Sequence, residues 1–267
     1  MENKFLVNIR KIEEIEEYKK VGVATFLFPL SSFCVGYERE FSLKEIENIK
    51  EENKYLLINR VLDCAAVDQL YVILKDLKNI KGIVFEDIAV YNIAKKLNLN
   101  VELIYFPNHF NTNVRTVNFF LSRVDSVFIA NELTKEEVKD ITEKANKEVV
   151  VQVFGHNQAM YSRRKLLNNF SREFVLPLHN PNTLVERVSK ISFKAIENEY
   201  GTVLYSGKIF NGLELLTLSN VKYFYINTTF IPLEEIINTI RKAKTELNTD
   251  NGFLGKETIY KLKEEAK

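Results

Sequence analysis

The chain has 267 residues, of which 46% are hydrophobic and 27% are charged, and this composition excludes a disordered or low-complexity protein. Lys and Arg number 37 and Asp and Glu 36, so the net charge of +1 gives no general attraction to nucleic acid or to an anionic membrane surface. The two cysteines, Cys34 and Cys64, lack CxxC spacing, which excludes a disulfide scaffold and a thiolate zinc site and predicts free thiols in a reducing cytoplasm.

Short β-branched and aromatic runs alternate with amphipathic stretches, which is the pattern of repeated βα units around a parallel sheet. The run at 21–29 is apolar on both faces, as buried parallel strands are. Capping boxes beginning at Ser42 and Thr134 predict helix starts. The predicted strands cover residues 5–9, 21–29, 55–59, 82–85, 101–106, 126–130, 149–154 and 223–227. The other predicted helices end at residue 20, cover 66–77, 88–97 and 112–121, and begin near 232.

The βα rhythm breaks after residue 154. Pro177 and Pro181 punctuate an irregular stretch, and residues 202–205 predict an accessory strand. Eight strands, most of them followed by a helix, in a chain whose length is close to the roughly 250 residues typical of such barrels favour an α/β fold of the TIM-like (β/α)8 barrel type. We therefore predict a single barrel domain over 1–267, with an irregular insertion at 155–210 between strands seven and eight. A doubly wound open sheet is the alternative, although no GxGxxG or GxxxxGK[ST] motif follows any strand.

In such a barrel, catalytic groups lie at the C-terminal ends of the strands. Glu86 and Asp87 follow the fourth strand and can form an acid/base pair, because burial and a neighbouring carboxylate raise a carboxyl pKa. The alternative is that Asp87 caps the next helix while Glu86 faces water. The alternative for Glu132 is that its charge lies at the start of a helix and interacts with the helix dipole. The polar residues expected around this mouth are Asn59, Arg60, Glu86, Asp87, Asn108, His109, Asn131, Glu132, Gln152 and His156.

The segment 153–167, VFGHNQAMYSRRKLL, is the densest polar signal and follows the seventh strand. His156, Ser162, Arg163 and Arg164 are expected at the mouth, where the two guanidinium groups can bind a carboxylate or phosphate. The alternative is the solvated start of a helix. Ser162 lacks the GxSxG context of a serine hydrolase.

No metal motif is present in the histidine spacing. His109, His156 and His179 have neither HxH nor HExxH spacing, so we expect no metal and assign each histidine a structural or surface alternative. Cys34 and Cys64 also follow strands, and a Cys/His nucleophilic pair is a further alternative.

Several segments, taken in order, resemble the collagenase-like peptidases of unassigned catalytic type, peptidase family U32. Glu86-Asp87 resembles the acidic strand end of that family, and residues 108–118 resemble the stretch that leads to its buried Asn, here Asn118. ANELTKEEV at 130–138 is similar to a segment that places Glu132 on the family glutamate. The resemblance extends in order over residues 40–247.

The family signature and its departures lie in two segments. Met160, Tyr161 and Ser162 match the signature that follows strand seven, whereas Gln152 stands where it has glutamate and Lys165 stands near its cysteine. The later "IEGR" element is replaced by INTTF at 226–230. Members that resemble iron–sulfur proteins have four cysteine ligands, and two cysteines cannot supply such a cluster, so we expect no cofactor.

The resemblance implies a peptidase that acts on peptide substrates. The catalytic candidates are Glu86, Asp87, Glu132, His156 and Ser162. The substrate-binding candidates are Asn59, His109, Asn118, Met160, Tyr161, Arg163 and Arg164. The alternatives are a non-catalytic or partner-dependent barrel that binds a small anionic ligand through Arg163 or Arg164, and an accessory factor in RNA hydroxylation.

The expected surroundings follow from charge and hydropathy. The N-terminal segment lacks a signal-peptide core, and charges interrupt every stretch that approaches membrane-spanning length, so we expect a cytoplasmic protein without membrane contact. The near-neutral charge gives no support for nucleic-acid binding. A homo-oligomer or a complex with a larger family member is the expected assembly.

Overall fold

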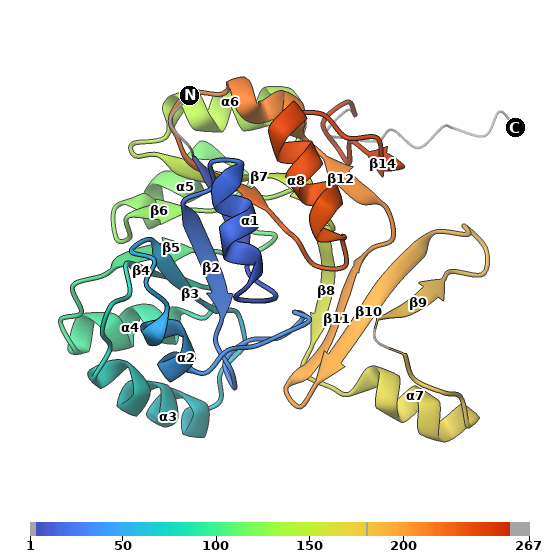
Figure 1. Cartoon of the computed structure of the whole chain (residues 1–267), viewed down its shortest axis with the longest axis horizontal. Helices are drawn as coiled ribbons and strands as arrows, with labels where there is room; N and C mark the ends of the chain where they lie inside the picture. Colours follow the sequence, from blue (N-terminus) through green and yellow to red (C-terminus); the bar gives the residue numbers. More distant parts are fainter. Residues whose placement is uncertain (1–3, 180, 257–267) are drawn as a thin grey trace, which may run out of the picture.

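A computed structural model describes residues 4–179 and 181–256. Its strands form a ten-stranded sheet, parallel except at one pair, and a separate four-stranded antiparallel sheet (Figure 1). The order in the large sheet is β14-β12-β7-β13-β1-β2-β3-β4-β5-β6. Its eight main strands are β1 (Phe5–Asn8), β2 (Thr25–Pro29), β3 (Lys54–Ile58), β4 (Gly82–Phe85), β5 (Glu102–Tyr105), β6 (Ser126–Val127), β7 (Val149–Gly155) and β13 (Val221–Ile226).

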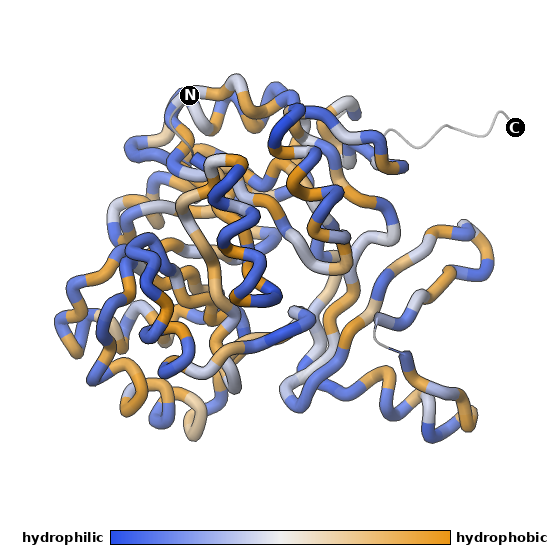
Figure 2. Tube along the Cα trace, in the orientation of Figure 1, coloured by the Kyte–Doolittle hydropathy of each residue, from blue (hydrophilic) through white to orange (hydrophobic). Residues whose placement is uncertain are grey.

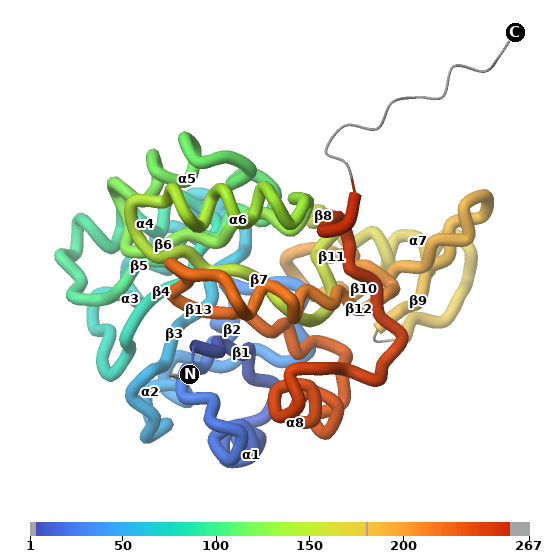
Figure 3. Tube along the Cα trace, turned by 90° about the horizontal axis from the view of Figure 1, so that it is seen from above, coloured from blue at the N-terminus to red at the C-terminus, as the bar shows by residue number. Residues whose placement is uncertain are grey.

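Each predicted strand of the barrel coincides with one of these eight, although β2 begins later and β6 is shorter than predicted. Two short strands, β12 (Ile209–Asn211) and β14 (Thr249–Asp250), extend the sheet beyond β7. Helices lie around the outside of the strands (Figure 3). They are α1 (Glu14–Lys20), α2 (Leu43–Asn48), α3 (Cys64–Lys75), α4 (Ile88–Lys96), α5 (Val114–Leu121), α6 (Lys135–Lys144), α8 (Leu233–Lys242) and the 3-10 helix η1 (Leu213–Thr217).

Two predicted capping boxes are confirmed and explain where α2 and α6 begin. The Ser42 hydroxyl accepts the Glu45 backbone N–H, and the Glu45 carboxylate accepts the Ser42 backbone N–H at 2.8 Å. Thr134 and Glu137 make the same reciprocal pair before α6. Each box satisfies two donors that a helix start would otherwise leave without partners.

The two ends of the parallel series, β6 and β7, approach each other. An isolated parallel bridge pairs Phe128 with Val150, and the Ile129 N–H donates to the Val150 carbonyl oxygen at 3.1 Å. The C-terminal end of β7 pairs instead with β12, where Phe210 lies opposite Gly155. The fold is therefore a mixed α/β structure with a large, curved parallel sheet whose ends are linked by a bridge and not by a continuous ladder.

Buried side chains fill both faces of this sheet. Successive residues of a strand point to opposite faces, so Leu6 joins an inner core while Val7 packs toward the helices. Outside, the helices alternate hydrophobic and hydrophilic residues (Figure 2). The inner core draws on every main strand or the residue after it, including Leu6, Leu27, Leu57, Val84, Ile104, Phe128, Val150 and Tyr225.

The described residues of the insert, 156–179 and 181–208, form a regular helix and strands, and the prediction of an irregular segment is wrong. It contains β8 (Gln158–Ser162), α7 (Leu166–Phe174), β9 (Asn182–Val185), β10 (Ser192–Asn198) and β11 (Gly201–Ser206), in the antiparallel order β8-β11-β10-β9. The predicted accessory strand lies within β11. The other strands escaped prediction because most of their residues are only partly buried and polar residues interrupt them, which leaves no continuous apolar run.

The insert packs against the large sheet through a small core of its own. Val35, in the loop after β2, contacts Ile196, Val203 and Tyr205 of the insert. The Tyr205 hydroxyl donates to the Gly36 carbonyl oxygen at 2.8 Å. The insert is therefore held over the C-terminal ends of the strands. None of the helices in the described part of the chain has the length and apolar character needed to cross a bilayer.

Candidate functional site

A cavity of about 520 Å³, which we call the mouth cavity, separates the C-terminal ends of β5 and β6 from the insert. The large sheet contributes polar residues that follow its strands, and the insert and the segment after β14 contribute the facing wall. The residues that line the cavity include Asn108, His109, Asn131, Glu132, Asn157, Lys190, Ile191, Phe193, Lys208, Phe210, Asp250, Phe253 and Lys256.

Glu86 adjoins this cavity through Asn108. It follows β4 directly, and its Oε2 accepts a hydrogen bond from the Asn108 Nδ2 at 3.0 Å. Burial raises the pKa of the Glu86 carboxyl to about 7, and the neighbouring Asp87 charge adds to the rise, while the bond from Asn108 opposes it. Glu86 is therefore a carboxyl group that can take up and release a proton near neutral pH.

The turn after β5 places two side chains at the cavity. Asn108 has a left-handed backbone with φ of 57°, a conformation that Asn tolerates better than most residues. The next residue, His109, lies with its Nδ1 3.3 Å from the Glu132 Oε1. The predicted residues Glu86, His109 and Glu132 are thus brought to one side of the molecule by three successive strand ends.

Asp87 takes the capping role that the sequence left as the alternative. Its Oδ1 accepts the Ala89 N–H and its Oδ2 accepts the Leu62 N–H, each at 2.9 Å. Both carboxylate oxygens thus hold backbone groups at the start of α4 and before α3. Glu86 is therefore the remaining acid/base candidate of this pair.

Carboxamide groups connect the strand ends on the cavity floor. The Asn131 Nδ2 donates to the Gln152 Oε1 at 3.1 Å, and the Gln152 Nε2 donates to the Asn157 Oδ1 at 2.8 Å. Gln152 is buried, and its amide satisfies one acceptor and one donor at once. A glutamate at this position would lack the hydrogen that Asn157 accepts.

His156 lies behind the cavity wall. It is 1% exposed, and its Nδ1 lies 2.7 Å from the Ser206 carbonyl oxygen. Burial, followed by the charge of Lys194, lowers the His156 pKa to about 4, so the ring is neutral at pH 7 and donates from Nδ1. His156 therefore joins the end of β7 to the end of β11 and does not line the cavity.

The signature residues of β8 run away from the mouth cavity and toward the residues that follow β3, so their catalytic and binding roles stay predictions. Ser162 pairs with Thr202 at the far end of the β8–β11 ladder, whereas His156 contacts Ser206 at the near end. The local sequence shows that these residues are polar, but it does not show that β8 leads them away from the end of β7. The side chains of Met160, Tyr161, Ser162, Arg163 and Arg164 do not contribute to the described cavity lining.

The contacts of these residues are structural. The Tyr161 hydroxyl donates to the Tyr200 carbonyl oxygen at 3.2 Å, and the Ser162 Oγ accepts the Arg164 N–H at the same distance. An Arg163 guanidinium nitrogen lies 3.6 Å from the Asp63 Oδ2. Arg163 is therefore partly neutralised by a carboxylate of the chain itself.

Asn59 and Asn118, which the sequence predicts to bind substrate, form hydrogen bonds with groups of the chain itself. The Asn59 Oδ1 accepts hydrogen bonds from the Val35 N–H and the Cys34 thiol, which orders the loop under the insert. Asn118 lies on α5, where its Nδ2 donates to the Lys144 carbonyl oxygen at 3.2 Å, away from the cavity. Burial raises the pKa of the Cys34 thiol, which disfavours its nucleophilic form.

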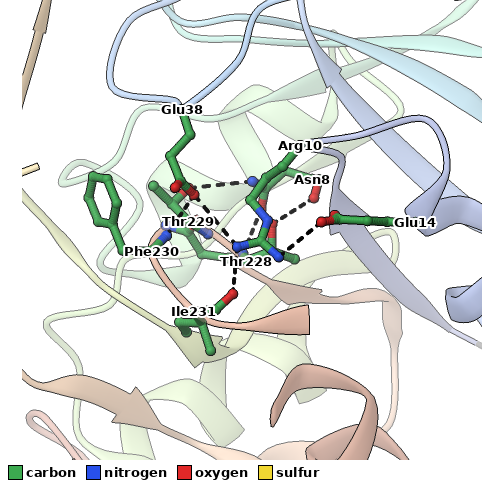
Figure 4. A network of polar contacts seen from close by, with 9 residues as sticks. Asn8, Arg10, Glu14, Glu38, Thr228, Thr229, Phe230 and Ile231 are labelled. Carbon is green, nitrogen blue, oxygen red and sulfur yellow. Dashed lines mark hydrogen bonds and ion pairs between the residues drawn. The ribbon is translucent and has the colours of Figure 1, made fainter. Parts of the chain in front are cut away.

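The INTTF segment after β13 is fixed by a polar network (Figure 4). The Arg10 side chain donates to the Ile231 carbonyl oxygen and pairs with Glu14 and Glu38. The Phe230 N–H donates to the Glu38 Oε2 at 2.9 Å. This network holds the Phe230 ring against the rings of His156 and Tyr205, and so supports the wall between the sheet and the insert.

No group of three His, Cys, Asp or Glu side chains that could hold a metal ion occurs within residues 4–179 and 181–256. His109 and Glu132 are two neighbours of that kind, and the cavity lining also contains the carboxamide groups of Asn108 and Asn131. The expectation of a metal-free site stays a prediction.

The family of this chain is given by comparison with known proteins. The model of peptidase family U32 matches residues 37–173, just over half of the sequence. The chain belongs to peptidase family U32. The solved structure of the U32 peptidase Mk0906 is similar over 86% of this chain and 94% of that chain, with a TM-score of 0.50 and 12% identity, a likeness that shows the fold alone.

A second solved structure, the spore cortex-lytic enzyme SleL of Bacillus cereus, covers 93% of this U32 chain and 76% of its own, with a TM-score of 0.44 and 8% identity. A search of curated proteins finds none that matches. The family match ends at residue 173, near the end of α7, so it includes β8 but not β9, β10 and β11. Most of the insert residues that line the mouth cavity therefore lie outside the match.

Sequence reasoning missed the cavity residues of the insert. Asn157, Lys190 and Lys208 lie in turns, and Lys256 follows the last short strand. Their local sequences carry no motif, since they converge only after the antiparallel sheet has formed. The one available signal was the break in βα rhythm after β7.

Proposed function

We propose that this U32 chain is a hydrolase that cleaves an amide bond of a peptide in the mouth cavity, with Glu86 as its acid/base group. The observation that carries the proposal is the Glu86 carboxyl group, whose pKa is raised to about 7. This group lies next to a cavity that is large enough for a few residues of peptide. A general base is most effective when its pKa is close to the working pH. Family membership supports the choice of peptide as substrate.

In the proposed reaction, the ionised Glu86 takes a proton from a water molecule as that water attacks the peptide carbonyl carbon. The proton then passes from Glu86 to the leaving nitrogen when the carbon–nitrogen bond breaks. Asn108 holds one carboxyl oxygen of Glu86 and so orients the group. Asn131 has a second N–H that can donate to the oxyanion, and His109, oriented by Glu132, supplies a further donor at the same wall.

We further propose that the eight main strands form a closed (β/α)8 barrel in solution, with β6 and β7 as its closing pair. The inner core, which draws on all eight strands, supports this proposal, as does the Phe128–Val150 bridge. Closure would place the ends of β4, β5 and β6 in one rim and explain why Glu86, His109 and Glu132 face the insert together. The free thiols of Cys34 and Cys64 support a cytoplasmic location.

The test is cleavage of a diverse peptide mixture followed by mass spectrometry. The wild-type protein is compared with Glu86→Gln and with Glu234→Gln, which changes an exposed carboxylate of α8. We expect wild type and Glu234→Gln to give the same products, and Glu86→Gln to lose at least about 100-fold in rate, the usual contribution of a general acid/base. Equal cleavage by Glu86→Gln, or none by freshly folded wild type, contradicts the proposal.

A further inference from the structure

Three lysines from separate segments line the insert side of the mouth cavity. Lys190 lies in the turn between β9 and β10, Lys208 in the turn between β11 and β12, and Lys256 follows β14. Among the residues that the structure describes, none of the three ammonium groups has an ion-pair partner within 4.0 Å. They are therefore cations that the cavity presents to something other than the chain itself.

The acidic groups of the same cavity are already engaged. Glu132 lies beside His109, and the Asp250 Oδ1 accepts the Gly252 N–H at 2.6 Å. Lys256 lies 4.8 Å from the centre of the Phe253 ring, which leaves its donors free for a ligand. The insert side of the cavity is thus positively charged, in contrast to the Glu86 side.

The backbone brings two of these lysines together by a close contact. The Gly207 N–H donates to the Ser192 carbonyl oxygen at 2.9 Å. A Cβ at position 207 would lie 2.5 Å from that oxygen, so only glycine allows the approach. Lys208 follows Gly207 directly and Lys190 precedes Ser192 by two residues, so this contact sets both lysines on one wall.

Apolar side chains lie next to the lysines. Ile191, Phe193, Phe210 and Phe253 line the same cavity. Ile191 is 56% exposed, so its apolar side chain is accessible to a ligand. The wall therefore combines cations with an apolar surface, which suits a ligand that carries an anionic group beside an apolar one.

We infer that the mouth cavity selects peptides that carry a carboxylate next to an apolar side chain, with the carboxylate bound by Lys190, Lys208 and Lys256. The inference rests on the proposed function, because it names the substrate class of the same cavity. The carboxylate lies on the insert side and the amide bond to be cleaved lies toward Glu86. Since lysine ammonium groups are point charges without fixed fork geometry, a terminal carboxylate and an Asp or Glu side chain can both supply the anion.

The test measures binding in the Glu86→Gln background, in which the proposed cleavage is blocked. Fluorescence anisotropy is recorded with labelled alanine pentapeptides that contain one phenylalanine. One pair differs only in a free or amidated C-terminus, and a second, amidated pair differs only in glutamate or glutamine next to the phenylalanine. We expect at least one carboxylate peptide to bind about tenfold more tightly than its neutral counterpart, from three partly exposed charge contacts. The pair that shows the difference identifies the source of the carboxylate.

The lysines are tested by the triple change Lys190→Gln, Lys208→Gln and Lys256→Gln. The matched control changes Lys44, Lys75 and Lys78, which are exposed on the opposite flank of the fold, to Gln. We expect the first variant to lose the tenfold preference and the control to keep it. Equal binding of charged and neutral peptides, no binding of any peptide, or an equal loss in both triple variants overturns the inference. Carboxylate-dependent binding without cleavage by wild type would refute the proposed function and leave the inference standing.

Discussion

The large sheet and the insert differ in how completely their hydrophobic side chains are buried. Strands β2, β3 and β4 are buried at every residue, because one face packs on the inner core and the other on the helices. The insert sheet is one-sided. Of the fifteen large hydrophobic residues exposed in the described chain, nine lie between 166 and 191. The mouth cavity lies between the large sheet, which is packed on both faces, and the insert, which is less completely buried. Its acid/base group therefore has firmer structural support than its binding residues on the insert.

The largest expected effect concerns the contact that links β6 to β7. Phe128 is 2% exposed and packs on Phe106, with ring centres 4.1 Å apart, and on Tyr225 at 5.4 Å. We expect Phe128→Ala to reduce the free energy of unfolding by about 3–5 kcal/mol, the usual cost of truncating a buried phenylalanine. Urea denaturation followed by circular dichroism measures it. A loss below about 1 kcal/mol would show that the end of the sheet is not packed as part of one core.

The second effect is the pH dependence of stability that Glu86 causes. Because its folded pKa is raised from 4.5 to about 7, the folded state binds the Glu86 proton more tightly than the unfolded state does. This contribution to wild-type stability is complete below pH 4.5 and is lost as the pH rises to about 7. We expect Glu86→Gln to match wild type at pH 4 and to exceed its unfolding free energy by up to about 3 kcal/mol at pH 8.

Parallel urea titrations at several pH values measure this difference. Glu234→Gln, an exposed change on α8, is the control and should show no comparable rise. A difference between Glu86→Gln and wild type that does not vary between pH 4 and pH 8 would contradict burial of the carboxyl group.

A third, intermediate effect separates the insert from the large sheet. Gly207→Ala forces a Cβ against the backbone of Ser192, which should cost about 1–3 kcal/mol, as overpacking does. We expect hydrogen exchange to accelerate in β10 and β11 while β1–β4 keep their protection. Ser206→Ala, which keeps the backbone contact of Gly207, is the local comparison. Equal acceleration in both layers would show that the two regions open as one unit.

The smallest effect is expected on the open face of the insert. Phe174 is 59% exposed and contacts Phe170, with ring centres 4.6 Å apart. We expect Phe174→Ser to change the free energy of unfolding by no more than about 0.5 kcal/mol, as surface substitutions usually do. Urea denaturation beside Phe128→Ala gives the contrast directly. A cost comparable to that of Phe128→Ala would show that α7 is covered in solution.

The fold of the large sheet could be predicted from local sequence, and that of the insert could not. Strands such as β3 and β4 are continuous apolar runs, and the Ser42 and Thr134 boxes mark helix starts through contacts three residues apart. The insert strands β8 and β9 are half exposed and pair only with distant partners. Their stability comes from the sheet they form, which no local pattern reports.

The same distinction applies to the candidate site. Glu86, His109 and Glu132 could be predicted because a strand end places its following residues at one rim whatever the rest of the chain does. The roles of His156 and Ser162 could not, because they depend on the direction of β8. Lys190 and Lys208 were missed for the same reason, since turns of the insert bring them to the cavity, and Lys256 reaches it only through the segment that follows β14.

The proposed chemistry requires Glu86 to titrate near neutral pH beside the mouth cavity. Carbon-13 NMR of the protein labelled at the glutamate side-chain carboxyl carbon follows this titration directly, with the Glu86 signal assigned by its absence from Glu86→Gln. We expect a midpoint of about 7. A midpoint near the ordinary glutamate value of 4.5 would contradict it.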